Sequence, residues 1–166
     1  FWVTVLLSAL LAIQRSASLD SADGTGTSLR MSGLSPVARY LGRTAAVFVQ
    51  LLALEALLVG GLVVLYGVSV EEWFLLVVAG VVAGVAVAAA GTLYGALASG
   101  LRARETLLPI LLLPVLAPVL IGATRAYDDA LGVAAVDGWA WTGLLAVAAL
   151  VLTVVGASAH GALVED

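Results

Sequence analysis

The side chain best placed to do chemistry in this sequence is Glu55, which lies near the middle of the apolar stretch Ala45–Tyr66. An ionisable group inside a stretch long enough to cross a bilayer is a candidate functional residue, because burying a charge in hydrocarbon is costly. Gln50 lies five residues earlier, about 140° around a helix, so the two side chains need separate partners. From the residues alone, Glu55 is either a protonated or hydrogen-bonded structural carboxyl, or the acid or base of an intramembrane enzyme.

Few other residues could support an enzyme. No second carboxylate lies in an apolar stretch, and no cluster of metal ligands and no Ser/His or Cys/His pair accompanies Glu55. The chain has no cysteine and a single histidine, His160, which leaves almost no material for a disulfide, a zinc site or heme ligation. We therefore assign no metal, no bound cofactor and no catalytic residue to this chain.

The charged residues exclude two further classes of protein. All seven basic residues are arginine and the net charge is −4, which excludes a nucleic-acid binder. The glycine-containing segment Gly24-Thr-Gly-Thr-Ser28 lacks the lysine of an ATP-binding P-loop, so the chain is not an ATPase.

Composition and segment length predict an all-α, polytopic integral membrane protein. Apolar residues make up 63% of the chain and charged residues 11%, and the mean hydropathy is +1.16. A hydrocarbon core of about 30 Å needs about 20 apolar residues in a helix. We expect one transmembrane domain over residues 1–166, with a cytoplasmic loop at 14–44 and spans at 1–13 (partial), 45–66, 73–98, 106–124 and 139–164.

The distribution of arginine predicts the orientation of these spans. Cytoplasmic connections collect Arg and Lys, and six of the seven arginines lie in two connections: Arg15, Arg30, Arg39, Arg43, Arg102 and Arg104. We therefore place both connections and the C-terminus in the cytoplasm of a plasma or inner membrane. Five spans then leave the visible N-terminus outside, so we expect a sixth, preceding span.

Two spans have unusual residue patterns. Span 106–124 carries Pro109, Pro114 and Pro118, each of which removes a helical hydrogen bond. We expect a kinked or broken helix there, which either only shapes the bundle or moves and lines a substrate path. Span 73–98 carries Gly80-Val-Val-Ala-Gly84 and Gly91-Thr-Leu-Tyr-Gly95, small-residue patterns that favour close helix packing within the chain over a dimer interface.

The polar segment before the second span contains a turn and a helix start. Asp23-Gly24 is a strong turn signal, and Ser35-Pro36 predicts an N-cap followed by proline at the first helical position, with the helix running on into the span. The segment is either a solvated connection or a docking surface for a soluble partner.

In order and spacing, these motifs resemble the CcmB family, the membrane subunit of the cytochrome c maturation ABC transporter, over nearly the whole chain. The resemblance rests on Phe1-Trp-Val-Thr-Val-Leu-Leu-Ser-Ala-Leu-Leu-Ala, Leu19-Asp-Ser-Ala-Asp-Gly24, Leu34-Ser-Pro36, Leu107-Leu-Pro-Ile-Leu-Leu-Leu-Pro-Val-Leu-Ala-Pro-Val and Val136-Asp-Gly138. The family's acidic motif usually begins with an aromatic residue and continues D-G-[ST]-L, whereas Thr25-Gly-Thr-Ser-Leu29 follows here.

The resemblance implies an ABC-2-type permease with six spans and both ends in the cytoplasm. It would couple ATP hydrolysis by a separate subunit to heme export or to release of the heme-loaded chaperone. Its partners would be a cognate ABC ATPase that binds ATP, a heme-handling membrane subunit and a heme chaperone, with heme as a candidate cargo. Asp20, Asp23 and Gly24 would then contact the ATPase, and the proline-containing span would be the element that ATP hydrolysis moves. An ABC-2-type permease that exports a lipid, a drug or a polysaccharide is the main alternative.

Overall fold

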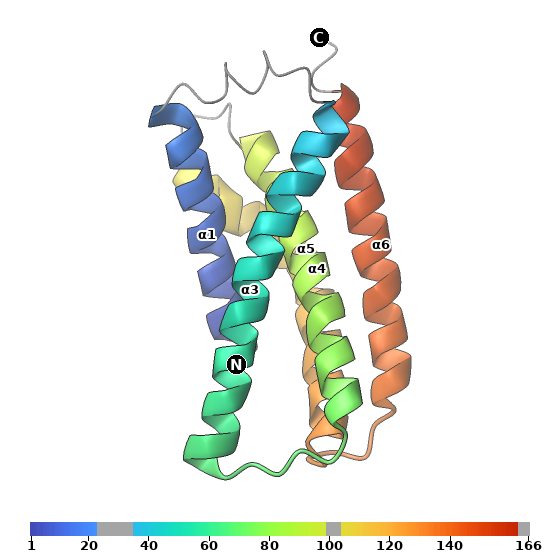
Figure 1. Ribbon diagram of the computed structural model, residues 1–166. Helices are drawn as coiled ribbons and strands as arrows, with labels where there is room; N and C mark the ends of the chain where they lie inside the picture. The colour runs from blue at the N-terminus through green and yellow to red at the C-terminus, as the bar shows by residue number, and fades with distance from the viewer. Residues whose placement is uncertain (23–34, 99–103, 163–166) are drawn as a thin grey trace.

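The structure is a computed structural model that describes the backbone of residues 1–22, 35–98 and 104–162. The described chain forms a bundle of long helices, shown in Figure 1: α1 (Trp2–Ala22), α3 (Pro36–Tyr66), α4 (Trp73–Ala98), α5 (Arg104–Ala130) and α6 (Gly138–Ala162). The prediction of an all-α, polytopic membrane protein is confirmed. Four of the helices, α3 to α6, are long and apolar enough to cross a membrane, whereas the apolar part of α1 is shorter.

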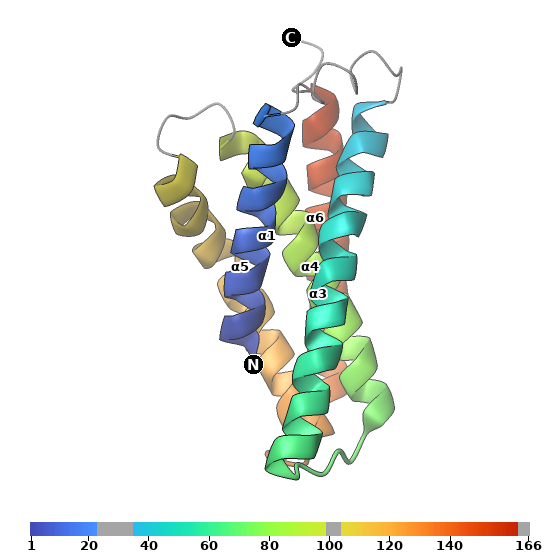
Figure 2. The ribbon, with the colours of Figure 1, turned by 60° about the vertical axis from the view of Figure 1, so that its left-hand side comes forward.

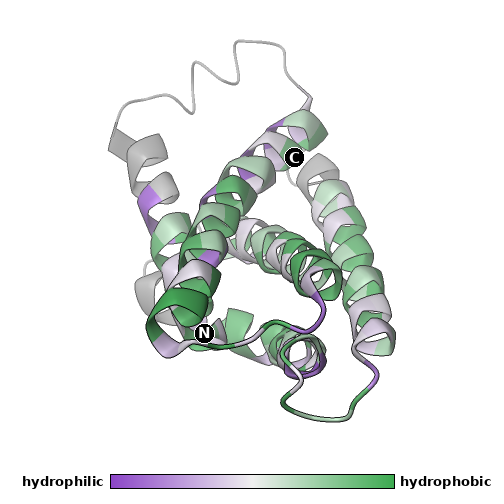
Figure 3. Cartoon of the chain, turned by 60° about the horizontal axis from the view of Figure 1, so that its bottom comes forward, coloured by the Kyte–Doolittle hydropathy of each residue, from purple (hydrophilic) through white to green (hydrophobic). Residues whose placement is uncertain are grey.

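Helix α4 forms the centre of the bundle and packs against each of the other four helices. Most of its residues are buried, whereas α3, α5 and α6 bury only a minority of theirs. Figure 3 shows that hydrophobic residues also cover the outer faces of the long helices. This pattern is typical of a bundle that faces lipid, because lipid tails impose no polar outer face.

The glycines of α4 explain how its neighbours pack so closely. A Cβ atom at Gly95 would lie 2.8 Å from Cγ2 of Ile13, and one at Gly91 would overlap the same isoleucine of α1. The side chain of Ile13 is buried between these two glycines. The predicted role of the small-residue patterns in packing within the chain is therefore confirmed. At Gly91 and Gly95 it is the side chain of Ile13, rather than the backbone of α1, that fills the space beside the glycines.

The predicted start of α3 is confirmed. Ser35 is the N-cap, and its hydroxyl accepts a hydrogen bond of 3.2 Å from the backbone N–H of Ala38. Pro36 follows in the first turn, and Gly67, with a φ of 62°, ends the helix in the left-handed conformation that favours glycine.

Helix α1 extends further than the sequence predicted. We expected a loop from residue 14, but the helix continues through residues 14–22 to Ala22. This segment contains neither glycine nor proline, so nothing in it interrupts the helix once the apolar run has ended.

Helix α5 remains continuous through its three prolines, so the broken helix that we considered is not found. It is not straight, however. In Figure 1 its first turns run obliquely behind α1, and its second half descends beside α4; Figure 2 shows the same separation of the first turns from the rest of the bundle. The three prolines in this region explain the bend, because each ring displaces the preceding turn.

The connections at one end of the bundle are tied together by hydrogen bonds. The backbone N–H groups of Glu71 and Glu72 donate to the carbonyl of Ala130 over 3.0 and 3.1 Å, which joins the α3–α4 connection to the end of α5. Asp129 Oδ2 accepts a bond of 2.8 Å from the backbone N–H of Gly138, where α6 begins. This end of the described chain is thus internally braced.

Candidate functional site

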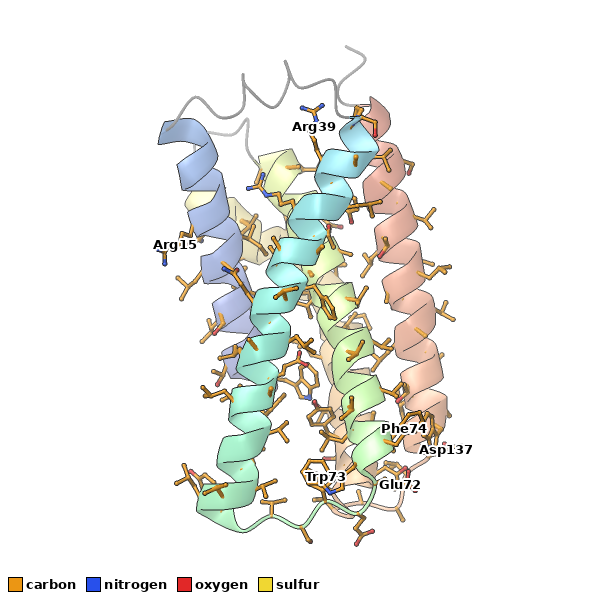
Figure 4. All side chains as sticks on the ribbon, in the orientation of Figure 1. Arg15, Arg39, Glu72, Trp73, Phe74 and Asp137 are labelled. Atoms are coloured by element: carbon orange, nitrogen blue, oxygen red, sulfur yellow. The ribbon has the colours of Figure 1, made fainter. Side chains whose placement is uncertain are left out.

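The two ends of the bundle carry different charges. Arg15 and Arg39 lie toward one end, while Glu72 and Asp137 lie at the other (Figure 4). We refer to the first as the arginine end and to the second as the acidic end. The predicted alternation of basic and acidic connections therefore corresponds to a physical polarity of the described helices.

Of the residues predicted to contact an ATPase, Asp20 is the one that the structure describes. Asp20 lies in the last turns of α1, which ends at the arginine end (Figure 1). Asp23 and Gly24 lie outside the described residues.

The prolines of α5 do not line the interior of this chain. Pro114 and Pro118 are exposed and Pro109 is half-buried. The opposite face of the helix is the buried one, where Leu112 and Leu116 are fully buried. The face of α5 that carries Pro114 and Pro118 is therefore turned away from the rest of the described bundle.

Glu55 is buried at the contact between α3 and α4. Its side chain is 4% exposed, and a Cβ atom at Gly80 would lie 3.1 Å from its Oε2. One at Gly84 would lie 3.4 Å from its Oε1. Gln50, in contrast, is exposed, which confirms the prediction that the two polar side chains do not share partners.

The carboxyl group of Glu55 retains unused hydrogen-bonding capacity. In the described part of the chain, no donor reaches its buried Oε1. A buried acceptor without a donor is unfavourable, because it has lost its hydration without replacement. The burial of Glu55 therefore leaves one carboxyl oxygen without a hydrogen-bond donor in the described part of the chain.

Tyr127 of α5 approaches Glu55 across Gly80. The hydroxyl oxygen of Tyr127 would lie 2.7 Å from a Cβ atom at Gly80, so the space that this glycine leaves open is shared by two polar side chains. The ring of Tyr127 packs against Trp2 and Phe1 of the chain's first turn, with centroid distances of 5.0 and 5.1 Å.

Sequence reasoning missed Tyr127 and Trp2 as neighbours of the Glu55 region. The available signal was the Gly80–Gly84 pattern, which predicts that something approaches α4 closely. The pattern does not identify what approaches, because that depends on which faces of α3 and α5 meet α4. The structure thus combines an acidic, a phenolic and an aromatic group at the junction of α1, α3, α4 and α5.

Comparison with known proteins agrees with the helical, membrane-spanning architecture. The family model described as CcmB protein matches residues 1–165. Heme exporter protein B of Haemophilus influenzae (strain ATCC 51907 / DSM 11121 / KW20 / Rd) is 30% identical over 136 residues, which cover 78% of this chain. The same alignment covers 58% of the relative, so the chain spans less than two thirds of that protein's length.

Proposed function

We propose, from the premise that the chain belongs to the CcmB family, that it is the permease subunit of an ABC transporter for cytochrome c-type biogenesis. The observation that carries the proposal is the family match over residues 1–165, joined by the similarity to a protein named heme exporter protein B. The apolar helices of the bundle agree with a transport role. ATP hydrolysis would take place on a separate ATPase subunit.

The arginine end is the proposed docking face for that ATPase. Its cytoplasmic orientation would follow from the arginines that it carries. Asp20, Asp23 and Gly24 would contribute to the contact, together with the beginning of α3. The heme-handling membrane subunit and the heme chaperone are further proposed partners, and heme is a candidate cargo rather than a ligand bound by this chain.

Helix α1 offers a mechanical route from the docking face into the bundle. It runs without interruption from Trp2 to Ala22, so a displacement at Asp20 would be transmitted along a rigid element. Ile13 of α1 packs against Gly91 and Gly95 of α4, and Trp2 of α1 contacts Tyr127 of α5. ATP hydrolysis could thereby shift α1 against the central helix and the bent helix together.

The proposed function is tested by staining covalently bound heme in membranes from a strain that lacks the gene. We expect c-type cytochromes to disappear and to return when the full-length gene is supplied. Unchanged heme staining in the deletion strain would contradict the proposal and would favour a permease for another cargo.

Docking is tested separately with acidic residues at the two ends of the chain. Asp20→Ala and Asp23→Ala should reduce copurification of the ATPase and restoration of c-type cytochromes, whereas Glu72→Ala, at the acidic end, should do neither. Equal behaviour of the three variants at equal protein levels would remove the docking assignment while leaving the family function in place.

A further inference from the structure

A cavity of about 400 Å³ lies between α3 and α4, in the half of the bundle toward the acidic end. Its walls are mainly aliphatic and include Leu52, Val59 and Val77, while Glu55, Tyr127 and Trp73 supply the polar and aromatic groups. This volume is within the range of small-molecule binding sites, which combine apolar walls with a few polar groups.

The cavity opens on the outer surface of the described bundle. Val77 and Trp73, which line it, are each 54% exposed, and Val64 at its edge is 80% exposed. Glu55, in contrast, is 4% exposed. Its Oε2 lies beside Gly80, which lines the cavity, whereas its Oε1 lies beside Gly84, which does not. A molecule that enters sideways from the bilayer would therefore find one strong acceptor at the buried side of an otherwise apolar space.

The charge balance of the cavity favours a cationic ligand. The sequence contains no lysine, and no arginine lines the cavity. Arg125, on the same helix as Tyr127, forms an ion pair with Asp128 rather than with Glu55, with 3.8 Å between Arg125 Nη1 and Asp128 Oδ2. A carboxylate in an apolar site is stabilised by an opposite charge that donates a hydrogen bond.

We propose that this cavity binds a compact lipophilic amine, with the ammonium group at Glu55 and the hydrocarbon body against the aliphatic walls. Gly80 lines the cavity, and its lack of a side chain lets Glu55 and Tyr127 approach each other there, since a Cβ atom at Gly80 would lie 2.7 Å from the Tyr127 hydroxyl oxygen and 3.1 Å from Glu55 Oε2. The site does not depend on whether the chain serves cytochrome maturation, and it identifies a ligand class that is distinct from heme.

Two glycines of α3 provide a matched pair of variants. Gly60 lines the cavity and Gly61 does not, and a Cβ atom at either position would meet nothing within 4 Å. The bundle should therefore accommodate leucine at either position. Leucine also has a higher helix propensity than glycine. Only Gly60→Leu places a side chain at the cavity.

The test uses tritiated 1-adamantylamine as the probe and the full-length protein in lipid nanodiscs, with empty nanodiscs to subtract partition into lipid. We expect saturable binding that Glu55→Gln weakens about tenfold or more, as for loss of a charged hydrogen bond. Gly60→Leu should weaken it to a similar degree, whereas Gly61→Leu and Glu72→Gln should stay within about twofold of the unmodified protein. The neutral analogue 1-adamantanol should compete at least tenfold more weakly than the unlabelled amine.

Several results would overturn the proposal. The absence of saturable binding to the intact protein would mean that another helix or nothing occupies the cavity. Equal competition by the alcohol, or unchanged binding to Glu55→Gln, would show that the carboxyl group does not select the amine. Equal losses in Gly60→Leu and Gly61→Leu would place the bound probe elsewhere.

Discussion

Replacement of Gly156 by alanine should destabilise the bundle strongly, because Tyr40 occupies the space beside this glycine. A Cβ atom at residue 156 would overlap the hydroxyl group and the ring of Tyr40. The ring is fully buried, and its hydroxyl lies 3.1 Å from the carbonyl oxygen of Ala89 and 3.4 Å from that of Leu152. Tyr40 of α3 thus connects α4 and α6 through backbone acceptors.

The magnitude follows from two contributions. Overpacking a filled interior costs about 1–3 kcal/mol, and displacing the tyrosine hydroxyl from its acceptors costs about 1 kcal/mol more. We therefore expect Gly156→Ala to lower the free energy of unfolding by about 2–4 kcal/mol. Tyr40→Phe alone should cost about 1 kcal/mol, and it should reduce the penalty of Gly156→Ala because the hydroxyl is the atom nearest the new methyl group.

The assay is reversible unfolding in mixed detergent micelles, followed by circular dichroism as the fraction of denaturing detergent rises. Gly143→Ala is the matched control on the same helix, since a Cβ atom there would meet nothing within 4 Å. A destabilisation by Gly156→Ala no larger than that of Gly143→Ala would refute the reasoning. Strict additivity of Gly156→Ala with Tyr40→Phe would refute the assigned contact.

Three further predictions concern packing, the acidic end and orientation. Gly91→Ala should displace Ile13 and destabilise the protein by about 1–3 kcal/mol, and Ile13→Ala should recover part of that loss in the same unfolding assay. Asp129→Asn should cost about 1 kcal/mol, because it weakens a charge-assisted hydrogen bond of 2.8 Å at the start of α6; an unchanged unfolding midpoint would contradict this. The chain contains no cysteine, so in an otherwise cysteine-free full-length protein an impermeant maleimide applied to intact cells should label Glu72→Cys and not Ser35→Cys; the reverse pattern would invert the proposed orientation.

Much of the fold was predictable because the signals are local. Long uncharged stretches predict α3 to α6 by length alone, and Ser35-Pro36 predicts where α3 begins because both residues act on the first turn. Hydropathy does not predict the end of α1, because the apolar run ends at Ile13 while the helix continues to Ala22. Polar residues can continue a helix beyond the hydrocarbon core of the membrane when neither glycine nor proline interrupts it.

The candidate site was only partly predictable because it depends on how helices pair. The burial of Glu55 follows from its position in an apolar stretch, but its approach to Tyr127 requires knowing which faces of α3 and α5 meet α4. The position of Trp2 beside Tyr127 is even harder to predict from the sequence, because it depends on how α1 packs against the other helices. The glycines of α4 indicated a close approach without identifying the side chains that make it.

The proposed coupling of ATP hydrolysis on a partner subunit to release of the heme-loaded chaperone is tested most directly by the heme chaperone itself. The measurement is the amount of heme-loaded chaperone in membranes of the deletion strain, compared with the same strain carrying the full-length gene. We predict that loaded chaperone accumulates in the deletion strain while c-type cytochromes are lost, because release of the loaded chaperone is the step that fails. Normal turnover of loaded chaperone together with normal c-type cytochromes would contradict the account.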